Sequence, residues 1–353
     1  MKFIHTADWH IGANRRLSSY LQRQEEMIDC VFDVAYDHDI RVVAIAGDIF
    51  EDPDTTTQEE REMLQRKLLQ YDSAGFTILM IPGNHDTVDA TGYSGIHYLS
   101  MLTDSGKFKH STVTERTSFV TVEDCVFCLL RHRKNKFAED SAAAVNSIFG
   151  SSLIHDHKDF VMICHETIRG SQTDIRLKDG SSFCLDSGED APDTSLPVTY
   201  WALGDIHKPQ EVAPNAYYSG APLQTKFADG WPRGVLVVDT QNPTEPKFVA
   251  IPSNQFVKVK VGDPVPDNAH VKWVFSSRED IPKEVPDSVV MISFEPETSL
   301  SSDRESLQID VHASFRDKIL AGIKGQGATE EELSLAAAEV DSILPLIEVE
   351  DGF

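Results

Sequence analysis

The sequence predicts an α/β fold in which two packed β-sheets carry helices on their outer faces. Three observations support this prediction. Residues 2–81 alternate short apolar runs with helix-periodic segments, which is the pattern of a β-α-β-α-β unit. The apolar runs are nearly continuous, as in the strands of a parallel sheet that is covered on both faces. Further strand-like runs follow between residues 118 and 251, and a second sheet is the simplest place for them.

The first third of the chain supplies strands and helices in strict alternation. We expect strands over Lys2–Thr6, Val42–Ala46 and Thr77–Ile81, because each is a short, largely apolar run that stops at a turn. Helices are expected over about 21–37 and 57–73. Each of these segments repeats its apolar residues at a spacing of three or four, which places them on one helix face.

Later strand-like runs look more antiparallel. Residues 118–122 and 125–130 flank Glu123-Asp124 and predict a hairpin. Runs over 160–164 and 199–203 lead into His165 and into Gly204-Asp205, and further runs follow at 217–218, 235–239 and 248–251.

The pattern changes after residue 252 and predicts three domains in all. Residues 1–253 form the main α/β domain. Residues 254–298 hold three short strand-like runs with Pro-rich connections, which predicts a small α+β capping domain. Residues 306–346 predict two amphipathic helices, the second opening on the capping box Thr329-x-x-Glu332. Whether these helices dock on a partner or pack on the main domain stays open.

Composition limits where and how the chain acts. It has 353 residues, a net charge of −25 and no run that approaches the ~20 apolar residues of a membrane span. No apolar stretch of a signal peptide opens the chain, so a soluble cytoplasmic protein is expected. The five cysteines are odd in number and suit reduced thiols, and Cys125-x-x-Cys128 looks like part of a buried strand. The negative charge weakens a claim of stand-alone DNA binding, because phosphate neutralisation supplies much of that affinity.

Five segments each end an apolar run with metal-ligand side chains. They read Asp8-Trp9-His10, Gly47-Asp48, Gly83-Asn84-His85-Asp86, His165-Glu166 and Gly204-Asp205-Ile206-His207. Ligands are expected at the carboxyl ends of strands, where open α/β sheets place their sites. Two metal ions sharing a carboxylate are a recurring device for hydrolysing phosphate esters. The sequence therefore predicts a dimetal site with seven ligands: Asp8, His10, Asp48, Asn84, His165, Asp205 and His207.

The residue types in these segments predict distinct roles. Asp8 and His10 are expected to face the same way because alternate side chains of extended backbone do so, and their mixed O and N donors suit Mn²⁺ or Fe. Asp48 is the natural bridge between two ions, and Asn84 can bind through its amide oxygen. His85 is the candidate for proton transfer to the departing oxygen.

The other titratable residues receive structural interpretations. His5 is expected in the core or behind the site, and Glu166 is expected to face away from it. Lys208 and Arg233 could touch substrate phosphates, but exposed surface charge is the favoured interpretation for both. The remaining histidines lack neighbouring ligands and are expected to be structural: His38, His97, His110, His132, His155, His157, His270 and His312.

These motifs resemble the calcineurin-like metallophosphoesterase superfamily. More narrowly, they are similar to the SbcD-type double-strand-break repair nuclease subunit of the meiotic-recombination-eleven family. The narrowing rests on the segments Phe3 to Gly12, Ala46 to Phe50, Ile81 to Asp86, Trp201 to Gln210 and Tyr218 to Gln224. The resemblance covers about residues 1–255. Beyond them only the order of parts matches, with a capping DNA-contact domain and then a helical pair.

The resemblance implies a metallophosphoesterase sandwich and a ligand set. The first ion would be held by Asp8, His10, Asp48 and His207, and the second by Asp48, Asn84, His165 and Asp205, with His85 as the catalytic histidine. The implied activity is Mn²⁺-dependent hydrolysis of DNA as exonuclease and endonuclease. The implied partners are DNA, a coiled-coil SbcC-type ATPase docked on the helical pair, and a second copy of the chain in a heterotetramer.

One departure and two alternatives stand beside this hypothesis. The family usually has Gly-His-x-His where this chain has Gly204-Asp205-Ile206-His207, so Asp205 adds negative charge at the second ion. A phosphoesterase of small molecules or phosphoproteins would share every ligand. A catalytically silent scaffold that tethers an ATPase to DNA ends is the other alternative, although the presence of Asp48 and His85 argues against it.

Overall fold

The structure is a computed structural model that describes most of the first 294 residues. The described residues are 1–15, 17, 19–86, 94–150, 159–176, 182–227, 231–252, 256–265, 269–276, 281–282, 284–286 and 288–294. The predicted helical segment 306–346 lies outside the described residues.

The first sheet has the strand order β14-β13-β1-β2-β3-β4. Its first four strands in the chain are parallel, and β13 and β14 add antiparallel pairs at one edge. The expected bounds of the first three strands are confirmed. The strands are β1 (Lys2–Thr6), β2 (Val42–Ala46), β3 (Thr77–Ile81), β4 (Thr112–Val113), β13 (Gly234–Asp239) and β14 (Lys247–Ala250).

The second sheet has the order β11-β12-β10-β7-β6-β5. The expected hairpin is confirmed, since β5 and β6 pair antiparallel. The antiparallel expectation for the later strands is wrong for the centre of this sheet, where β6, β7, β10 and β12 are all parallel. Long connections allow parallel pairing, which needs a crossover. The strands are β5 (Ser118–Val122), β6 (Cys125–Leu129), β7 (Asp159–His165), β10 (Tyr200–Gly204), β11 (Gln210–Ala213) and β12 (Ala216–Tyr218).

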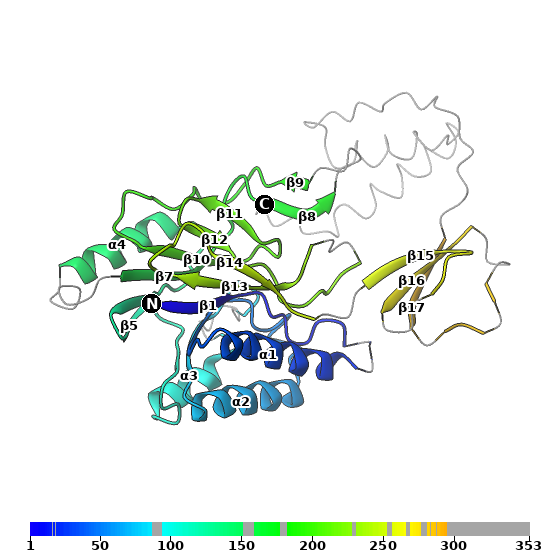
Figure 1. Cartoon of the computed structure of the whole chain (residues 1–353), viewed down its shortest axis with the longest axis horizontal. Helices are drawn as coiled ribbons and strands as arrows, with labels where there is room; N and C mark the ends of the chain where they lie inside the picture. Colours follow the sequence, from blue (N-terminus) through cyan, green and yellow to red (C-terminus); the bar gives the residue numbers. More distant parts are fainter. Residues whose placement is uncertain are drawn as a thin grey trace, which may run out of the picture. The chain divides into compact units, whose positions relative to one another are not determined.

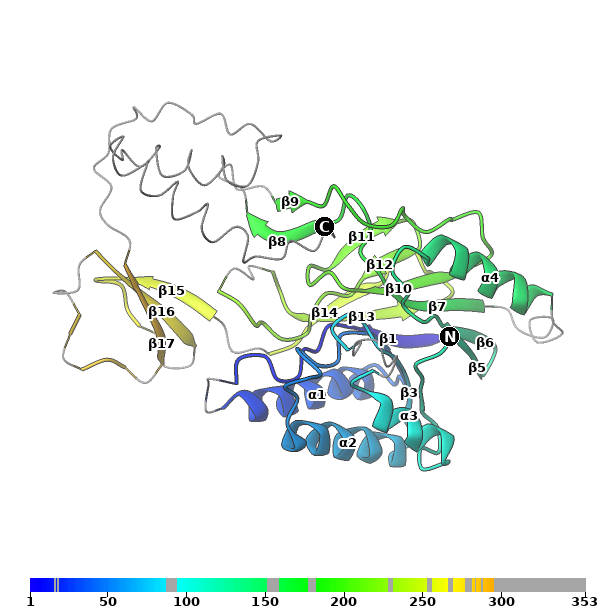
Figure 2. The same ribbon diagram turned by 180° about the vertical axis from the view of Figure 1, so that it is seen from behind.

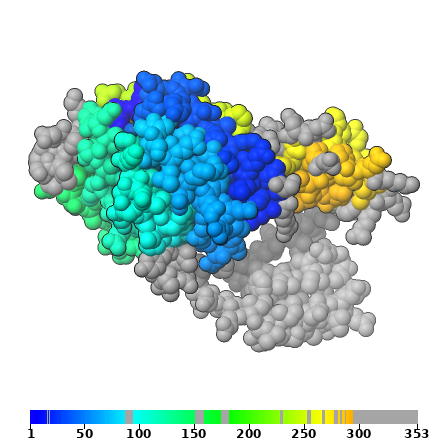
Figure 3. Space-filling view, turned by 90° about the horizontal axis from the view of Figure 1, so that it is seen from below, coloured from blue at the N-terminus to red at the C-terminus, as the bar shows by residue number. Residues whose placement is uncertain are grey.

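Helices cover the outer faces of both sheets, as predicted (Figure 1). The helices α1 (Tyr20–Asp37), α2 (Gln58–Ser73) and α3 (His97–Asp104) share an apolar core with the first sheet. The helix α4 (Phe137–Phe149) shares another with the second sheet. The view from behind shows the same layering, and the space-filling view shows the face made by the blue to cyan helices α1–α3 (Figures 2 and 3).

A third apolar core lies between the two sheets and joins them. His5 is fully buried between the same sheets, as expected. The Leu203 carbonyl can only accept a hydrogen bond, so His5 Nε2 carries a proton and donates to it (3.1 Å), while the Tyr200 hydroxyl donates to Nδ1 (3.1 Å). Burial lowers the pKa of His5 to about 3, so the ring is neutral. This buried imidazole thereby connects β1 of one sheet to β10 of the other.

Two smaller sheets complete the described residues. The strands β8 (Gln172–Arg176) and β9 (Ser182–Cys184) pair antiparallel, and β15 (Phe256–Lys260), β16 (His270–Phe275) and β17 (Val289–Phe294) form a parallel sheet. The three strands expected after residue 252 are therefore present, but the described part of residues 256–294 contains no helix. All five cysteines are free thiols, and Cys125 and Cys128 lie in the buried strand β6, as expected. Among the described residues, no helix has the length and apolar character to cross a bilayer.

Asp72, at the end of α2, holds the start of β4 in place and provides a test of the fold. Its buried carboxylate accepts backbone N–H groups of Lys109 (2.8 Å), His110 (2.9 Å) and Ser111 (2.8 Å). Burial alone would raise the pKa of Asp72, but these N–H donors outweigh it and hold that pKa below its ordinary value.

We expect Asp72→Asn to lower the free energy of unfolding by about 1–3 kcal/mol at neutral pH, because one carboxylate oxygen is replaced by a donor that faces donors. A depressed carboxyl pKa stabilises the fold above the unfolded value, and this contribution is lost as pH falls through the folded value. The difference between parent and variant in urea unfolding should therefore shrink as the pH falls below about 4, the ordinary value of an aspartate. Asp33→Asn, at an exposed site on α1, is the control. A difference that does not change with pH would contradict the assignment.

Candidate metal centre

All seven predicted ligands and His85 lie at one edge of the two packed sheets. Each lies at or just after the carboxyl end of a parallel strand, and parallel strands bring these ends to the same edge. Hydrogen bonds then join the two sheets at this edge. Asp205 N donates to Asp8 Oδ1 (2.9 Å), and His165 Nδ1 lies 2.8 Å from the Ala46 carbonyl oxygen. The structure thus brings together residues that stand up to 199 positions apart, as His207 and Asp8 do.

One group of ligand atoms surrounds His165 Nε2. Because a carbonyl only accepts, His165 Nδ1 carries a proton toward Ala46, and Nε2 faces the cluster. Within this cluster Nε2 lies 2.8 Å from Asn84 Oδ1, 3.2 Å from Asp48 Oδ1 and 3.8 Å from Asp205 Oδ1. Ligands with bonds of about 2.1 Å to a small octahedral ion lie about 3 Å apart. The distances from His165 Nε2 to Asn84 Oδ1 and Asp48 Oδ1 fit such an ion, and Asp205 Oδ1 lies farther out.

A second group surrounds His10 Nε2. It lies 2.9 Å from His207 Nε2, so the two imidazole nitrogens face each other. On the other side of the ring, His10 Nδ1 lies 2.9 Å from Glu51 Oε2. A carboxylate on one ring nitrogen orients a histidine so that the other nitrogen can bind a metal. His10 and His207 are therefore arranged as a pair of nitrogen ligands.

Asp48 lies between the two groups. Its Oδ1 is 3.2 Å from His165 Nε2 and its Oδ2 is 3.8 Å from His10 Nε2, so each oxygen faces a different group. Oδ1 also accepts the backbone N–H of His85 (3.0 Å). A carboxylate that bridges two ions would need such an arrangement, with one oxygen toward each group.

The backbone reaches this geometry through left-handed conformations. Positive φ angles occur at Asp8 (56°), His10 (45°), Asp48 (50°) and Asp205 (107°). The expectation that Asp8 and His10 face the same way because of extended alternation is therefore wrong in its reason, since both lie beyond β1 in left-handed turns. Non-glycine residues in strained backbone cost of order 1–3 kcal/mol each and concentrate at functional sites. Neighbouring structure holds all four in place.

Glycines allow the two sheets to approach each other around His165. A Cβ on Gly83 would lie 2.5 Å from Asp48 N and 2.7 Å from His165 Cε1. A Cβ on Gly204 would overlap the Ala46 carbonyl oxygen and lie 2.7 Å from His165 Nδ1. Any larger residue at either position would push apart the ligands that these contacts bring together.

The electrostatics of the cluster favour a bound cation. Burial raises the pKa of Asp8 to about 7, and Asp8 Oδ2 has no hydrogen-bond partner among the described residues. Burial alone would raise the pKa of Asp48, but the His165 and His10 imidazoles outweigh burial and hold it well below its ordinary value. Burial alone would likewise lower the pKa of His165, but the carboxylates of Asp48 and Asp205 outweigh burial and hold that pKa well above its ordinary value. Buried carboxylates without enough positive charge are costly, and divalent ions supply that charge.

His85 lies next to His10 and Glu51, at the side of the candidate ligand groups. Its Nδ1 lies 2.8 Å from the Glu51 carbonyl oxygen, which can only accept, so Nδ1 carries a proton. The ring is exposed, and its centroid lies 5.0 Å from that of His10. This contact fixes the orientation of the ring with Nε2 as its second nitrogen. His85 is thus placed beside the ligand groups with one nitrogen available for proton transfer.

Several residues that support the site carry no assigned role in the sequence prediction. Glu51 contacts both His10 and His85. It stands three positions after Asp48 in the sequence, and this closeness could have indicated that Glu51 belongs to the site. Asp86 accepts backbone N–H groups of Ile49, Phe50 and Gly83, which ties the β2 loop to the β3 loop. For Asp86 the corresponding signal was its position directly after His85.

Two further supports come from the His165 side. The Thr167 hydroxyl donates to Asp205 Oδ2, and His132 Nδ1 donates to the His165 carbonyl (2.8 Å). His132 also contacts Glu166, which faces away from the ligand atoms as expected. Arg233 was interpreted as a surface charge, and this is wrong: it is 5% exposed and donates to the His207 carbonyl.

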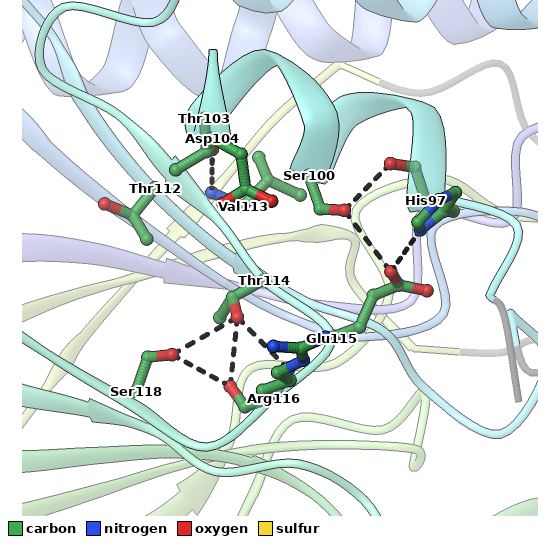
Figure 4. Close-up of a pocket in the computed structure, with 10 residues that line it drawn as sticks. All are labelled: His97, Ser100, Thr103, Asp104, Thr112, Val113, Thr114, Glu115, Arg116 and Ser118. Atoms are coloured by element: carbon green, nitrogen blue, oxygen red, sulfur yellow. Dashed lines mark hydrogen bonds and ion pairs between the residues drawn. The ribbon is translucent and has the colours of Figure 1, made fainter. Parts of the chain in front are cut away.

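A separate pocket between α3 and β4 does not offer a second catalytic arrangement (Figure 4). It has a volume of about 280 Å³ and contains Ser100, His97 and Glu115. The Ser100 hydroxyl lies 2.8 Å from the His97 carbonyl and 3.3 Å from Glu115 Oε2, while His97 Nδ1 lies 2.6 Å from the same carboxylate. A serine nucleophile needs its hydroxyl on a histidine ring nitrogen, so these contacts do not form that arrangement.

Comparison with known proteins agrees with the chemistry of this centre. Residues 1–167 match the family model of the calcineurin-like phosphoesterases. The chain is 26% identical to the SbcD subunit of nuclease SbcCD from Bacillus subtilis over 308 residues, which are 77% of this chain and 72% of that protein. It is 23% identical to the SbcD subunit of nuclease SbcCD from Staphylococcus saprophyticus over 253 residues, 69% of this chain and 66% of that protein.

A solved structure of Yfce, a phosphoesterase from E. coli, aligns with 71% of this chain and 100% of its own. The identity is 11% and the TM-score is 0.29, so no argument is based on this likeness. The resemblance to SbcD-type proteins predicted from the motifs is confirmed by the family match and the curated relatives. These findings support a hydrolase of phosphoester bonds.

Gly83→Ala tests whether the close approach at the strand ends sets the activity. We expect phosphoester turnover to fall by at least about 100-fold, because displacing reacting groups by about 1 Å costs that much. The measurement is hydrolysis of a p-nitrophenyl phosphate ester with added metal. Gly75→Ala is the control, since its new Cβ would meet no atom within 4 Å, although its φ of +89° will cost some stability. Parental turnover in Gly83→Ala would contradict the geometry described above.

Proposed function

We propose that this chain, an SbcD-type member of the calcineurin-like metallophosphoesterases, hydrolyses DNA phosphodiester bonds as a Mn²⁺-dependent exonuclease and endonuclease. The observation that carries the proposal is Asp48, whose two oxygens face two separate groups of ligand atoms. A shared carboxylate is what a two-ion phosphodiesterase needs. The curated relatives named as nuclease subunits support DNA as the substrate.

The ligand atoms divide between two proposed ions. Asp48 would contribute to both. The first ion would also be held by Asp8, His10 and His207, and the second by Asn84, His165 and Asp205. When bound, two divalent ions supply an activated water and positive charge against the phosphate as negative charge develops there. Mixed nitrogen and oxygen donors suit Mn²⁺, and Asp205 in place of the family's usual histidine makes the second set richer in hard oxygen ligands.

We assign proton transfer to His85. Hydrolysis forms a bond from water oxygen to phosphorus and breaks the bond from phosphorus to the departing 3′ oxygen, which must take up a proton. The Glu51 carbonyl accepts from His85 Nδ1, so Nε2 of the protonated ring is the atom that gives the proton to the departing oxygen. Asp86 and Gly83 hold the loop that carries His85, and Glu51 orients both His85 and His10. The chain's own residues therefore position the ligands and the acid.

The remaining parts of the proposal concern partners. A chain with a net charge of −25 gains little from long-range attraction to DNA, so we propose that an SbcC-type coiled-coil ATPase supplies much of the DNA affinity and docks on residues 306–346. Two copies of the chain would act within a heterotetramer. Residues 254–298 would form a capping domain that contacts DNA. The curated relatives, named as one subunit of SbcCD, support this assembly.

Two variants separate metal binding from proton transfer. We expect Asp48→Asn to lose Mn²⁺ affinity and cleavage of both linear duplex DNA and a p-nitrophenyl phosphate ester. His85→Gln should keep Mn²⁺ affinity, measured by calorimetry, while its DNA cleavage rate falls by about 10²–10⁴-fold. His110→Gln is the control, because that exposed histidine lies before β4, at the opposite edge of the sheet.

The same assays discriminate between the alternatives. Turnover of the small ester without any release of nucleotides from DNA would replace the nuclease with a small-substrate phosphoesterase. DNA cleavage by Asp48→Asn equal to that of the parent would contradict the dimetal site itself and would revive the scaffold alternative.

Removal of residues 305–353 tests the partner. We expect the truncated chain to lose co-purification with the coiled-coil ATPase, because the predicted amphipathic helices are gone, while hydrolysis of the small ester continues. Continued binding of the ATPase would place the docking surface elsewhere. Folding of the truncated chain is measured by circular dichroism. If both folding and small-ester hydrolysis are lost, these helices instead pack on the main domain.

A further inference from the structure

The most basic run of this acidic chain lies directly beside the candidate metal centre. Residues 131–136 read Arg-His-Arg-Lys-Asn-Lys and follow strand β6, in a chain with 32 basic and 57 acidic residues. We call residues 131–136 the basic run. Four cations in six positions are unusual in such a chain, and neither the metal centre nor the fold requires them.

Strand pairing places the basic run next to His165. Strand β6 is the parallel neighbour of β7, with Leu129 paired to Ile163, and Leu130 N donates to the Ile163 carbonyl (2.9 Å). The chain therefore leaves β6 at the same edge at which His165 ends β7. His132 then anchors the run, because its Nδ1 donates to the His165 carbonyl (2.8 Å). The basic run and the proposed ligand His165 share one short, hydrogen-bonded connection.

The pairing of the charges shows which cations are available. Apart from His132, all residues of the basic run are exposed. Arg133 pairs with Asp140, and Lys136 Nζ lies 2.6 Å from Glu139 Oε2, both in the first turn of α4. Arg131 and Lys134 form no ion pair or side-chain hydrogen bond with any residue that the structure describes. Within the described part of the chain, these two exposed cations thus have no acidic partner.

The charges of the basic run contribute little to the stability of the fold. Like charges placed side by side repel, and exposed ion pairs contribute only about 0–1 kcal/mol. Asn135 takes a left-handed φ of 59°, so the loop also carries a less favoured backbone conformation. An anionic partner would convert the repulsion into attraction. The proposed ions neutralise the phosphate that is cleaved, and they leave the neighbouring phosphates of a strand without a counter-charge.

We propose that Arg131 and Lys134 bind phosphates of the cleaved DNA strand. These phosphates neighbour the phosphate at which the strand is cut. This proposal rests on the nuclease function proposed above and adds a substrate contact to it. A local basic surface at the centre would let a chain of net charge −25 engage a polyanion, because the field close to the site, rather than the total charge, acts on the bound strand. It would favour DNA over small phosphate esters, which carry no neighbouring phosphates.

The test compares two double variants that change charge equally. Arg131→Gln with Lys134→Gln removes the proposed contacts, whereas Lys107→Gln with Lys109→Gln removes two exposed cations before β4, at the opposite edge of the sheet. Binding of the full chain to a labelled duplex oligonucleotide is measured by fluorescence anisotropy in EDTA, where no cleavage occurs, over a series of salt concentrations. Turnover of a p-nitrophenyl phosphate ester with Mn²⁺ reports whether the centre is intact.

For the 131/134 variant we expect roughly tenfold weaker binding at about 0.1 M salt, and a slope of log K against log salt that is smaller by about 1.8. Its small-ester turnover should equal that of the parent, and the 107/109 variant should bind as the parent does. Equal weakening in both variants, or an unchanged slope, would overturn the proposal.

The failure of each proposal has its own signature. If the parent cleaves DNA and the 131/134 variant binds and cleaves it equally well, the nuclease stands and only the role of the basic run is lost. If the parent hydrolyses the small ester but neither binds nor cleaves DNA, the nuclease function fails, and the phosphate contact fails with it.

Discussion

The close contact between the two sheets at their carboxyl edges is the constraint on which the rest of the site depends. His165 belongs to the second sheet, yet its Nδ1 donates to the Ala46 carbonyl at the end of β2 in the first. Gly83 and Gly204 leave room for this contact because neither has a Cβ. Once the ring is held in this way, its Nε2 faces Asn84 and Asp48 from the other sheet. Candidate ligands from the two sheets thus lie together in one cluster.

The strained turns follow from the same constraint. Asp8, His10, Asp48 and Asp205 all adopt left-handed backbone at strand ends, where extended strands would carry their side chains past the centre. Hydrogen bonds between the loops offset this strain, above all those accepted by the buried Asp86 carboxylate. Backbone N–H groups that donate to the carboxylates of Asp8, Asp48 and Asp86 therefore hold the site, and Asp8 Oδ2 has no hydrogen-bond partner among the described residues. These donors and the nearby imidazoles offset part of the cost of burying the carboxylates.

The charges of this chain are distributed so that an anionic substrate would be attracted only at the candidate metal centre. The chain is strongly acidic as a whole, and the buried carboxylates of Asp8 and Asp48 lie together where divalent ions would offset them. The proposed contact of residues 131–136 with DNA would add a positive surface only at the edge of the centre. Under this proposal, affinity from the whole molecule would have to come from a partner, while the chain itself would select where the strand is cut. The chain would then carry the catalytic chemistry and a local phosphate contact, and a partner subunit would add most of the affinity.

The sequence by itself determined the elements and the ligand types. Periodicity predicted β1, β2, β3, α1 and α2 nearly to the residue, because apolar spacing is a local property. Motifs at strand ends identified the seven candidate ligands and His85, although their roles stay proposals. Tertiary structure alone decided what depends on distant pairing. It made the centre of the second sheet parallel, buried Arg233 against His207, and brought Glu51 and His132 to residues they support. Sequence spacing does not predict such contacts, because they form only when two sheets pack and their strand ends meet.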